Sequence, residues 1–247
     1  MHYCVSDIHG CFKAFEKLLE TINFSQEDTL YILGDVLDRG EEVLPLLNYI
    51  QEHENIILLK GNHEAIALNC LYNFDISSVD TKLWGQNGGD VTLDAFMNLK
   101  GHEKRNLLHF LNNLKTYIEV DAGDYHYLLV HGGFDTSLSE SVEEVKEDEL
   151  LWYRGPYLQK PYFDKVVVSG HIPTLGLYPY FRKSLIFRQY DEKYYDYNMI
   201  FEAMKDAKES NIINLKHFIY IDGGCVFGHK LACLRLEDQK TFYVQNR

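Results

Sequence analysis

The chain has 247 residues and a mass of 28.9 kDa, with 46% hydrophobic and 25% charged residues. This composition excludes a disordered chain, a collagen-like repeat and a coiled coil. A formal net charge of −13 at pH 7 argues against a nucleic-acid polymer or an anionic membrane as partner, because both would be repelled. No apolar run approaches the roughly 20 residues of a membrane span, and the N-terminus does not resemble a signal peptide.

Five short apolar runs, each closed by a glycine or a polar cluster, predict buried strands. These strands are expected at residues 2–6, 29–33, 55–59, 125–130 and 166–168. Helical periodicity predicts helices over residues 11–22, 41–53, 64–74, 93–97 and 102–117. The first third therefore alternates strand and helix, which predicts a mainly parallel sheet with right-handed crossovers.

The last third has a different pattern. Residues 218–221, 230–236 and 241–245 predict three strands joined by short turns, which we expect to form an antiparallel closing sheet. The fold class is thus mixed α/β, a layered sandwich with helices outside. The chain has no Pro/Ser-rich linker, low-complexity tract or internal repeat, so we expect a single domain over residues 1–247.

A stretch rich in Tyr and Phe, with interleaved Arg182, Lys183 and Arg188, occupies about residues 175–215. It is interpreted either as a packed cap with tyrosines at its rim or as a substrate-recognition surface. The five cysteines form no CxxC pair, which predicts reduced, mostly buried thiols and a cytoplasmic protein.

Polar side chains follow the apolar strands at the point where each strand ends. That edge is where ligand sites form in open α/β sheets, so these side chains are expected to converge. Two carboxylates, one amide and three imidazoles without a thiolate suit Mn, Fe or Zn. Six ligands exceed the need of one tetrahedral ion, and two ions that share the Asp35 carboxylate would use them all. The candidate ligands are Asp7, His9, Asp35, Asn62, His131 and His171.

Three neighbouring residues add catalytic chemistry to these ligands. Arg39 offers a guanidinium that binds two phosphate oxygens at once. His63, next to Asn62, is a candidate general acid for a leaving alkoxide, and Asp38 would orient its ring. Arg154 has two open interpretations, a second phosphate ligand or a surface ion pair. Each motif alone is compatible with a turn, a helix cap or a core histidine, and only the joint pattern favours a site.

These motifs together resemble the calcineurin-like metallophosphoesterases, and within them the phosphoprotein phosphatase superfamily. The resemblance is strongest to bacterial and bacteriophage serine/threonine protein phosphatases, and the same branch contains symmetrical diadenosine tetraphosphate hydrolases. It extends from Asp7 to about Gly228. The segments that carry it are Asp7-Ile8-His9-Gly10, Gly34-Asp35-Val36-Leu37-Asp38-Arg39-Gly40, Gly61-Asn62-His63-Glu64, His131-Gly132-Gly133 and Gly170-His171, with Trp84-Gly85-Gln86-Asn87-Gly88-Gly89 and the segment from Ile221 to Gly228 typical of the bacterial branch.

The resemblance implies a four-layer α/β/β/α fold and a centre of two divalent metal ions that share Asp35. It also implies that His63, supported by Asp38, is the general acid and that Arg39 and Arg154 bind phosphate. Three residues depart from the family pattern: Ser6 replaces Gly, Ile172 replaces Thr and Gly223 replaces Thr. None of these departures removes a candidate ligand.

Three functions follow from this pattern as hypotheses. The first is a serine/threonine phosphoprotein phosphatase that uses a hydroxide activated by two metal ions. The second is a symmetrical diadenosine tetraphosphate hydrolase, in which the aromatic segment would stack adenine rings. The third is a phosphate-binding protein without turnover. The expected partner is therefore a phosphorylated protein or a small phosphoester.

Overall fold

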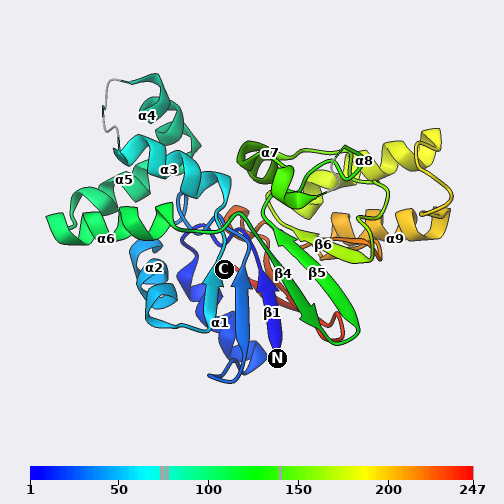
Figure 1. The fold of residues 1–247 in the computed structure, drawn as a ribbon, viewed down its shortest axis with the longest axis horizontal. Coiled ribbons are helices and arrows are strands. Elements are labelled where there is room, and N and C mark those ends of the chain that lie inside the picture. Colours follow the sequence, from blue (N-terminus) through cyan, green and yellow to red (C-terminus); the bar gives the residue numbers. More distant parts are fainter. Residues whose placement is uncertain (73–74, 76–77, 139–140, 247) are drawn as a thin grey trace.

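A computed structural model describes residues 1–72, 75, 78–138 and 141–246 of the chain. Two five-stranded mixed sheets pack face to face, and helices cover the outer face of each sheet (Figure 1). The predicted layered α/β sandwich is therefore confirmed. No helix within these described ranges is long and apolar enough to cross a membrane.

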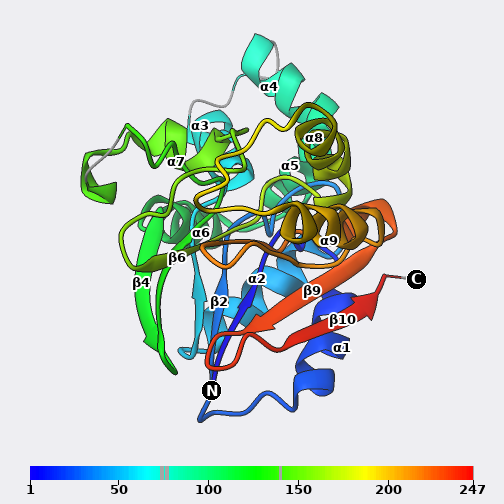
Figure 2. The ribbon, with the colours of Figure 1, turned by 90° about the vertical axis from the view of Figure 1, so that its right-hand side faces the viewer.

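The first sheet has the strand order β10-β9-β1-β2-β3. Its parallel part consists of β1 (His2–Val5), β2 (Thr29–Ile32) and β3 (Ile56–Leu58). The hairpin of β9 (Lys230–Arg235) and β10 (Thr241–Gln245) extends this sheet antiparallel to β1, as Figure 2 shows. The parallel part follows from the strand–helix alternation of the sequence.

Helices cross over between these strands and cover the outer face of the first sheet. The apolar side of α1 (Phe12–Ile22), which includes Phe15 and Leu18, is buried in the same core as α2 (Val43–Glu52). This packing buries the 3.6-residue stripes that predict both helices. The remaining elements on this side are α3 (Asn62–Tyr72), α4 (Val79–Trp84), a π-helical turn (Gly85–Gly89), α5 (Asp90–Met97) and α6 (Gly101–Asn112).

The second sheet has the strand order β4-β5-β6-β8-β7. Its strands β5, β6 and β8 run parallel, while β4 and β7 are antiparallel to their neighbours. Its strands are β4 (Tyr117–Ala122), β5 (Tyr125–Val130), β6 (Lys165–Ser169), β7 (Ile213–Asn214) and β8 (Phe218–Tyr220). The helices on this side are α7 (Glu147–Trp152), α8 (Thr174–Phe187) and α9 (Tyr197–Lys208), with short 3₁₀ turns at Val142–Glu144 and Cys225–Phe227.

A buried apolar layer joins the two sheets. Cys4 and Leu33 from the first sheet's side meet Leu129, Val168 and Ile219 from the second in one core cluster. Every second side chain of a strand points to the inner face of its sheet, and these side chains make the contact. The layer fixes the two sheets relative to one another, and with them the loops at their strand ends.

Two predicted elements are wrong. The helix expected over 102–117 ends at Asn112, because Tyr117 begins β4 and pairs with Val130 in a hairpin. The three C-terminal strands do not share a sheet, since β8 pairs parallel with β6 in the second sheet. Apolar alternation identifies a strand but not its partner, and a strand buried between neighbours fits either sheet. The predicted end of the helix at Phe74 lies outside the described residues.

The Tyr-rich stretch forms most of α8, all of α9, the loop between them and β7. Phe181 and Tyr195 are fully buried, and Tyr178, Tyr180 and Tyr190 pack against the core of the second sheet. These buried rings fit the interpretation as a packed cap, and the role of the stretch as a substrate-recognition surface stays a hypothesis. The single domain stays a prediction.

Candidate active site

Five of the predicted metal ligands lie in the loops after β1, β2, β5 and β6, and Asn62, which follows β3, is the first residue of α3. The carboxyl ends of the parallel strands in each sheet meet at one edge, as expected for a ligand site. All six side chains are buried, with no residue more than 8% exposed. Two groups of potential ligand atoms form there, each within 4.8 Å of one another. One is His9, Asp35 and His63, and the other is Asp35, His131 and His171.

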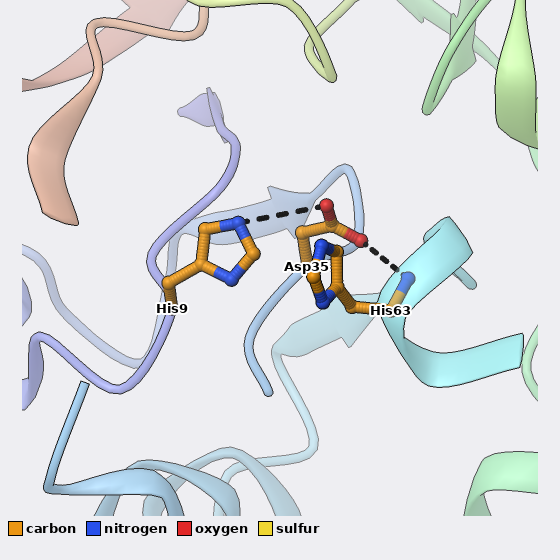
Figure 3. A group of neighbouring side chains, drawn as sticks. All are labelled: His9, Asp35 and His63. Atoms are coloured by element: carbon orange, nitrogen blue, oxygen red, sulfur yellow. Dashed lines mark hydrogen bonds and ion pairs between the residues drawn. The ribbon is translucent and has the colours of Figure 1, made fainter. Parts of the chain in front are cut away.

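Asp35 lies at the centre of this arrangement. Its Oδ2 is 3.6 Å from His9 Nε2 and 3.5 Å from His131 Nε2, so one oxygen faces an imidazole from each sheet. Asp35 Oδ1 accepts the backbone N–H of His63 at 3.0 Å, and Figure 3 shows the contacts of this carboxylate with His9 and His63. Asp35 is thus shared by both groups of potential ligand atoms, and its role as the bridge stays a prediction.

Backbone carbonyls set the orientation of two of the histidine rings. His9 Nδ1 donates to Leu37 O at 2.7 Å, and His131 Nδ1 donates to Leu33 O at 2.6 Å. A carbonyl only accepts, so each neutral ring carries its proton on Nδ1 and presents the Nε2 lone pair to the site. Such an outer contact is the usual device that fixes the tautomer of a metal-binding histidine.

Several acceptor atoms converge without a donor between them. His131 Nε2 lies 2.8 Å from Asn62 Oδ1, so two lone pairs face one another when the ring is neutral. His171 Nε2 is buried and has no hydrogen-bond partner among the described residues. Uncompensated acceptors are costly in a buried site, and a cation would satisfy them. The donor set therefore fits divalent metal ions.

Asp7 enters the site through different contacts and belongs to neither group. Its Oδ2 accepts the backbone N–H of His171 at 2.9 Å and a short hydrogen bond from the Ser6 hydroxyl. Gly170 lies so close that a Cβ on it would overlap Ser6 Oγ. Ser6, one of the departures from the family pattern, thus occupies the space beside this glycine and orients the Asp7 carboxylate.

Burial and neighbouring charges shift the pKa values of several groups in the cluster. Burial, together with nearby Arg39, lowers the pKa of His9 well below its usual range. Burial and the neighbouring His131 lower the pKa of His171 to about 2, so both rings are neutral. Burial raises the pKa of Asp35 well above its usual range, and the Asp7 carboxylate raises it further. Neutral imidazoles beside the destabilised Asp35 carboxylate are the electrostatic counterpart of a cation site.

His63 and Asp38 form a buried pair beside this cluster. His63 Nδ1 lies 2.6 Å from Asp38 Oδ2, and its Nε2 faces the site. Trp84 Nε1 and the Thr92 hydroxyl donate to the same carboxylate at 2.9 and 2.6 Å. Burial lowers the pKa of His63, but the Asp35 and Asp38 carboxylates outweigh it, and the net pKa lies above the ordinary value. The pair thus has the geometry of an oriented acid–base group.

The Arg39 guanidinium lies next to the rings of His9 and His63. Its Nη1 lies 2.6 Å from His9 Nε2 and its Nη2 lies 2.8 Å from His63 Nε2. The guanidinium also lies over the ring of Phe227, with 5.4 Å between Cζ and the ring centroid. It is therefore placed to contact an anion bound next to the cluster.

The site opens into a cavity of about 250 Å³. Arg39 and the exposed Arg154 both line it, which brings the two predicted phosphate ligands to one cavity. Asp222, a buried carboxylate, also faces it, and burial and the Asp7 charge raise its pKa well above the usual range. The apolar wall of the cavity consists of Ile172, Pro173, Val226 and Phe227.

Glu64 organises the loop after β2. Its buried carboxylate accepts the backbone N–H groups of Asp35, Val36, Leu37 and Gly61, at 2.7 to 3.2 Å. Four amide donors hold the loop that carries Asp35 against the start of α3. Glu64 belongs to the Gly61-Asn62-His63-Glu64 segment, but its role was not predicted, because four contacts to backbone have no sequence signature. The roles of Thr92 and Trp84 were missed for the same reason.

The loops that carry the site have an unusual backbone conformation. Six predicted site residues have φ between 46° and 68°, a region that non-glycine residues seldom adopt. Such conformations persist only where the surrounding structure enforces them, and they cluster at functional sites. A Cβ on Gly61 would lie 2.2 Å from Asp35 Oδ1, so only glycine allows this close approach. The six residues are Asp7, His9, Asp35, Asp38, Arg39 and His171.

Fold and site together define a hydrolase of phosphoesters, built around buried Asp, Asn and His side chains at the strand ends. The calcineurin-like phosphoesterase family model matches residues 3–203, which is most of the chain. The chain belongs to this family, as its motifs predict.

Among its relatives is serine/threonine-protein phosphatase 2 of Salmonella typhimurium, which is 31% identical over 157 residues, covering 63% of this chain and 69% of the relative. A symmetrical bis(5'-nucleosyl)-tetraphosphatase of Chromobacterium violaceum is 24% identical but covers 97% of this chain and 93% of the relative. A solved protein serine/threonine phosphatase from Saccharomyces cerevisiae shares the fold, with a TM-score of 0.56, 14% identity and coverage of 99% of this chain and 78% of that one.

Proposed function

We propose that this protein is a metal-dependent serine/threonine phosphoprotein phosphatase. The observation that carries the proposal is the Asp35 carboxylate, whose Oδ2 faces His9 and His131 while its Oδ1 accepts from the backbone of His63. One carboxylate thus lies between ligand atoms from two sheets and next to an oriented histidine. That is the arrangement expected for hydrolysis of a phosphomonoester at a pair of ions.

The chain offers two sets of residues for two divalent ions, Mn, Fe or Zn, that share Asp35. When bound, such ions activate the attacking water and stabilise the charge of the transition state. The Nε2 atoms of His9 and His131 are already directed inward by Leu37 O and Leu33 O. The proposed ligands are Asp7, His9, Asp35, Asn62, His131 and His171.

Two arginines would bind the phosphoryl group. Arg39 lies beside His9 and His63 at the cluster, and Arg154 lies at the exposed rim of the same cavity. Their guanidinium groups suit the oxygens of a tetrahedral phosphate and would hold the phosphorus in line for attack. Both guanidinium groups also offset the negative charge of the surrounding acidic residues when a dianionic substrate enters.

His63 would protonate the departing oxygen. Its Nδ1 is engaged by Asp38, so its Nε2 is the atom that faces the substrate. A serine or threonine alkoxide is a poor leaving group and needs this proton, whereas a phenolate does not. Asp38 keeps the ring oriented through its contacts with Trp84 and Thr92.

A second candidate function is hydrolysis of a dinucleoside polyphosphate. The observation in its favour is the length of a sequence match, because the symmetrical tetraphosphatase of Chromobacterium violaceum aligns with 97% of this chain. The stacking of adenine on the Tyr-rich stretch, which this function was expected to use, finds little support because most of those rings pack into the core. Phe227, 58% exposed in the cavity wall, is an alternative stacking surface.

One screen separates these functions. The purified protein is supplied with Mn²⁺ and tested on p-nitrophenyl phosphate, a phosphoserine peptide and diadenosine tetraphosphate, with products separated by chromatography. Turnover of the phosphopeptide well above that of the dinucleotide is expected. Preference for the dinucleotide would establish the second function, and no turnover with any divalent metal would indicate a phosphate-binding protein.

A further inference from the structure

The helix α8 starts at the edge of the active-site cavity. Ile172 and Pro173, which line the cavity, lead directly into the helix, and Thr174 N donates to the backbone O of Asp222 in the cavity wall. Its inner face, with Leu177 and Phe181, is buried in the core of the second sheet. Figures 1 and 2 show α8 at the periphery of the molecule, and the side chains of its outer face are exposed along the helix.

The exposed face of α8 is a continuous stripe that mixes apolar and basic side chains. Its residues recur at intervals of three, four and seven, which places them on one side of a helix. Ile186 is 60% and Phe187 is 64% exposed at the far end, so two large apolar side chains lie on the surface next to the basic residues. We call this stripe the α8 face, and it consists of Leu175, Pro179, Arg182, Lys183, Ile186 and Phe187.

The charge of the α8 face is opposite to that of the rest of the protein. The chain carries a net charge of −13, yet α8 contains no Asp or Glu. Within residues 1–72, 75, 78–138 and 141–246, the side chains of Arg182 and Lys183 form no ion pair or hydrogen bond. The following residue, Arg188, adds a third cation, and acidic residues appear only in the next loop at Asp191 and Glu192.

We propose that the α8 face docks an acidic segment of the phosphoprotein substrate that carries one or two apolar anchor residues. The inference rests on the proposed phosphatase function. Arg182 and Lys183 would pair with the carboxylates, and Ile186 and Phe187 would cover the anchors. The 14 residues of α8 span about 20 Å, which corresponds to roughly six residues of extended chain.

Charge complementarity favours a short segment over an anionic membrane. At physiological salt, charges act over a Debye length of about 8 Å, so a peptide that lies along α8 meets mainly its cations. A membrane plane would also approach the acidic surroundings, which carry most of the net charge. A docked acidic segment additionally neutralises the two cations beside it.

The test compares two phosphoserine peptides that differ only in a tail. In the first, Asp and Glu surround one Leu and one Phe, and in the second Asn and Gln replace the acids. Each peptide is made with the tail on either side of the phosphoserine. We expect the wild-type protein to have a KM about tenfold lower for an acidic tail on one of the two sides, and this advantage to shrink at high salt.

The variant Arg182→Glu/Lys183→Glu should abolish the tenfold advantage and leave kcat on p-nitrophenyl phosphate unchanged. Phe187→Ser should raise the KM for both peptides at all salt concentrations, because both tails carry the Leu and Phe anchors. The matched control is Lys17→Glu/Lys216→Glu, which changes the net charge equally at exposed positions away from α8. Circular dichroism and melting temperature confirm that each variant is folded.

Docking is also measured without turnover, by fluorescence anisotropy of the unphosphorylated acidic tail. Loss of binding in Arg182→Glu/Lys183→Glu and retention in the control support the proposal. Equal binding of both tails, or an advantage that survives the double variant, overturns it. So does a dimer that dissociates in the double variant, or binding to phosphatidylserine vesicles in place of the tail. An inactive wild-type protein that still binds the tail would instead contradict the phosphatase function.

Discussion

The two sheets contribute unequal halves of the candidate site. In the first-sheet half, buried protein groups hold the functional side chains: Glu64 accepts three amides of the Asp35 loop and the amide of Gly61, and Thr92 and Trp84 hold Asp38. In the second-sheet half, His171 Nε2 has no partner among the described residues, and His131 Nε2 faces the oxygen of Asn62. The first half is organised by the chain itself, whereas the second half needs an ion to complete it.

Asp35→Asn tests the residue that joins the two halves. An amide cannot bridge two cations as a carboxylate does, so we expect loss of at least one ion and a fall in turnover of about 10⁴-fold, close to 5 kcal/mol. Elemental analysis and kcat on p-nitrophenyl phosphate measure both effects. Asp124→Asn, in the exposed β4–β5 turn, is the control. A full complement of ions in Asp35→Asn would remove this residue from the centre.

His63→Asn tests the acid of the first half. Turnover of a phosphoserine peptide should fall by about 10³-fold because the alkoxide leaves without a proton, while p-nitrophenyl phosphate is much less affected. Ion content should stay at the wild-type level. His126→Asn, an exposed histidine paired with Asp121, serves as control. An equal loss on both substrates would mean that His63 acts on the ions and not on the leaving group.

Glu64→Gln tests how far the protein itself holds the first half. The new amide would direct N–H groups at backbone N–H donors, so the folded state should lose about 3 kcal/mol. Urea unfolding without added metal measures the change, with the exposed Glu54→Gln as control. If Glu64→Gln changed stability no more than Glu54→Gln, the loop after β2 would be held by packing alone.

Mn²⁺ addition tests the dependence of the second half on an ion. Binding at 100 times Kd stabilises the folded state by about 2.7 kcal/mol, which raises Tm by roughly 5–10 °C in a domain of this size. His171→Ala should lose a large part of this shift while its Tm in a chelator stays near the wild-type value. A full Mn²⁺ shift in His171→Ala would exclude His171 as a ligand.

Ser6→Ala should have the smallest effect. It removes the hydroxyl that donates to Asp7 and leaves the space beside Gly170 partly empty, a loss of about 1 kcal/mol at most. Titration with Mn²⁺ should show an affinity within tenfold of wild type. A larger loss would mean that Ser6 has become essential for the orientation of Asp7 in this chain.

Much of the candidate site was predictable, for a physical reason. Parallel strands end at a common edge, so a polar residue after an apolar run is placed there by the fold class itself. The identities of Asp7, His9, Asp35, Asn62, His131 and His171 then suggest metal chemistry without coordinates. The role of Glu64 was not predictable, because its four acceptor contacts depend on how α3 approaches the loop after β2.

The local order of residues by itself determined the strands, most helices and the chemical character of each loop, because periodicity and glycine placement act over a few residues. Only the tertiary structure decided that β8 joins the second sheet, that most rings of the Tyr-rich stretch are buried, and that Arg182 and Lys183 lie on an exposed face. These outcomes depend on which surfaces meet across the two sheets, and contacts between distant residues leave no periodic signal in a single sequence.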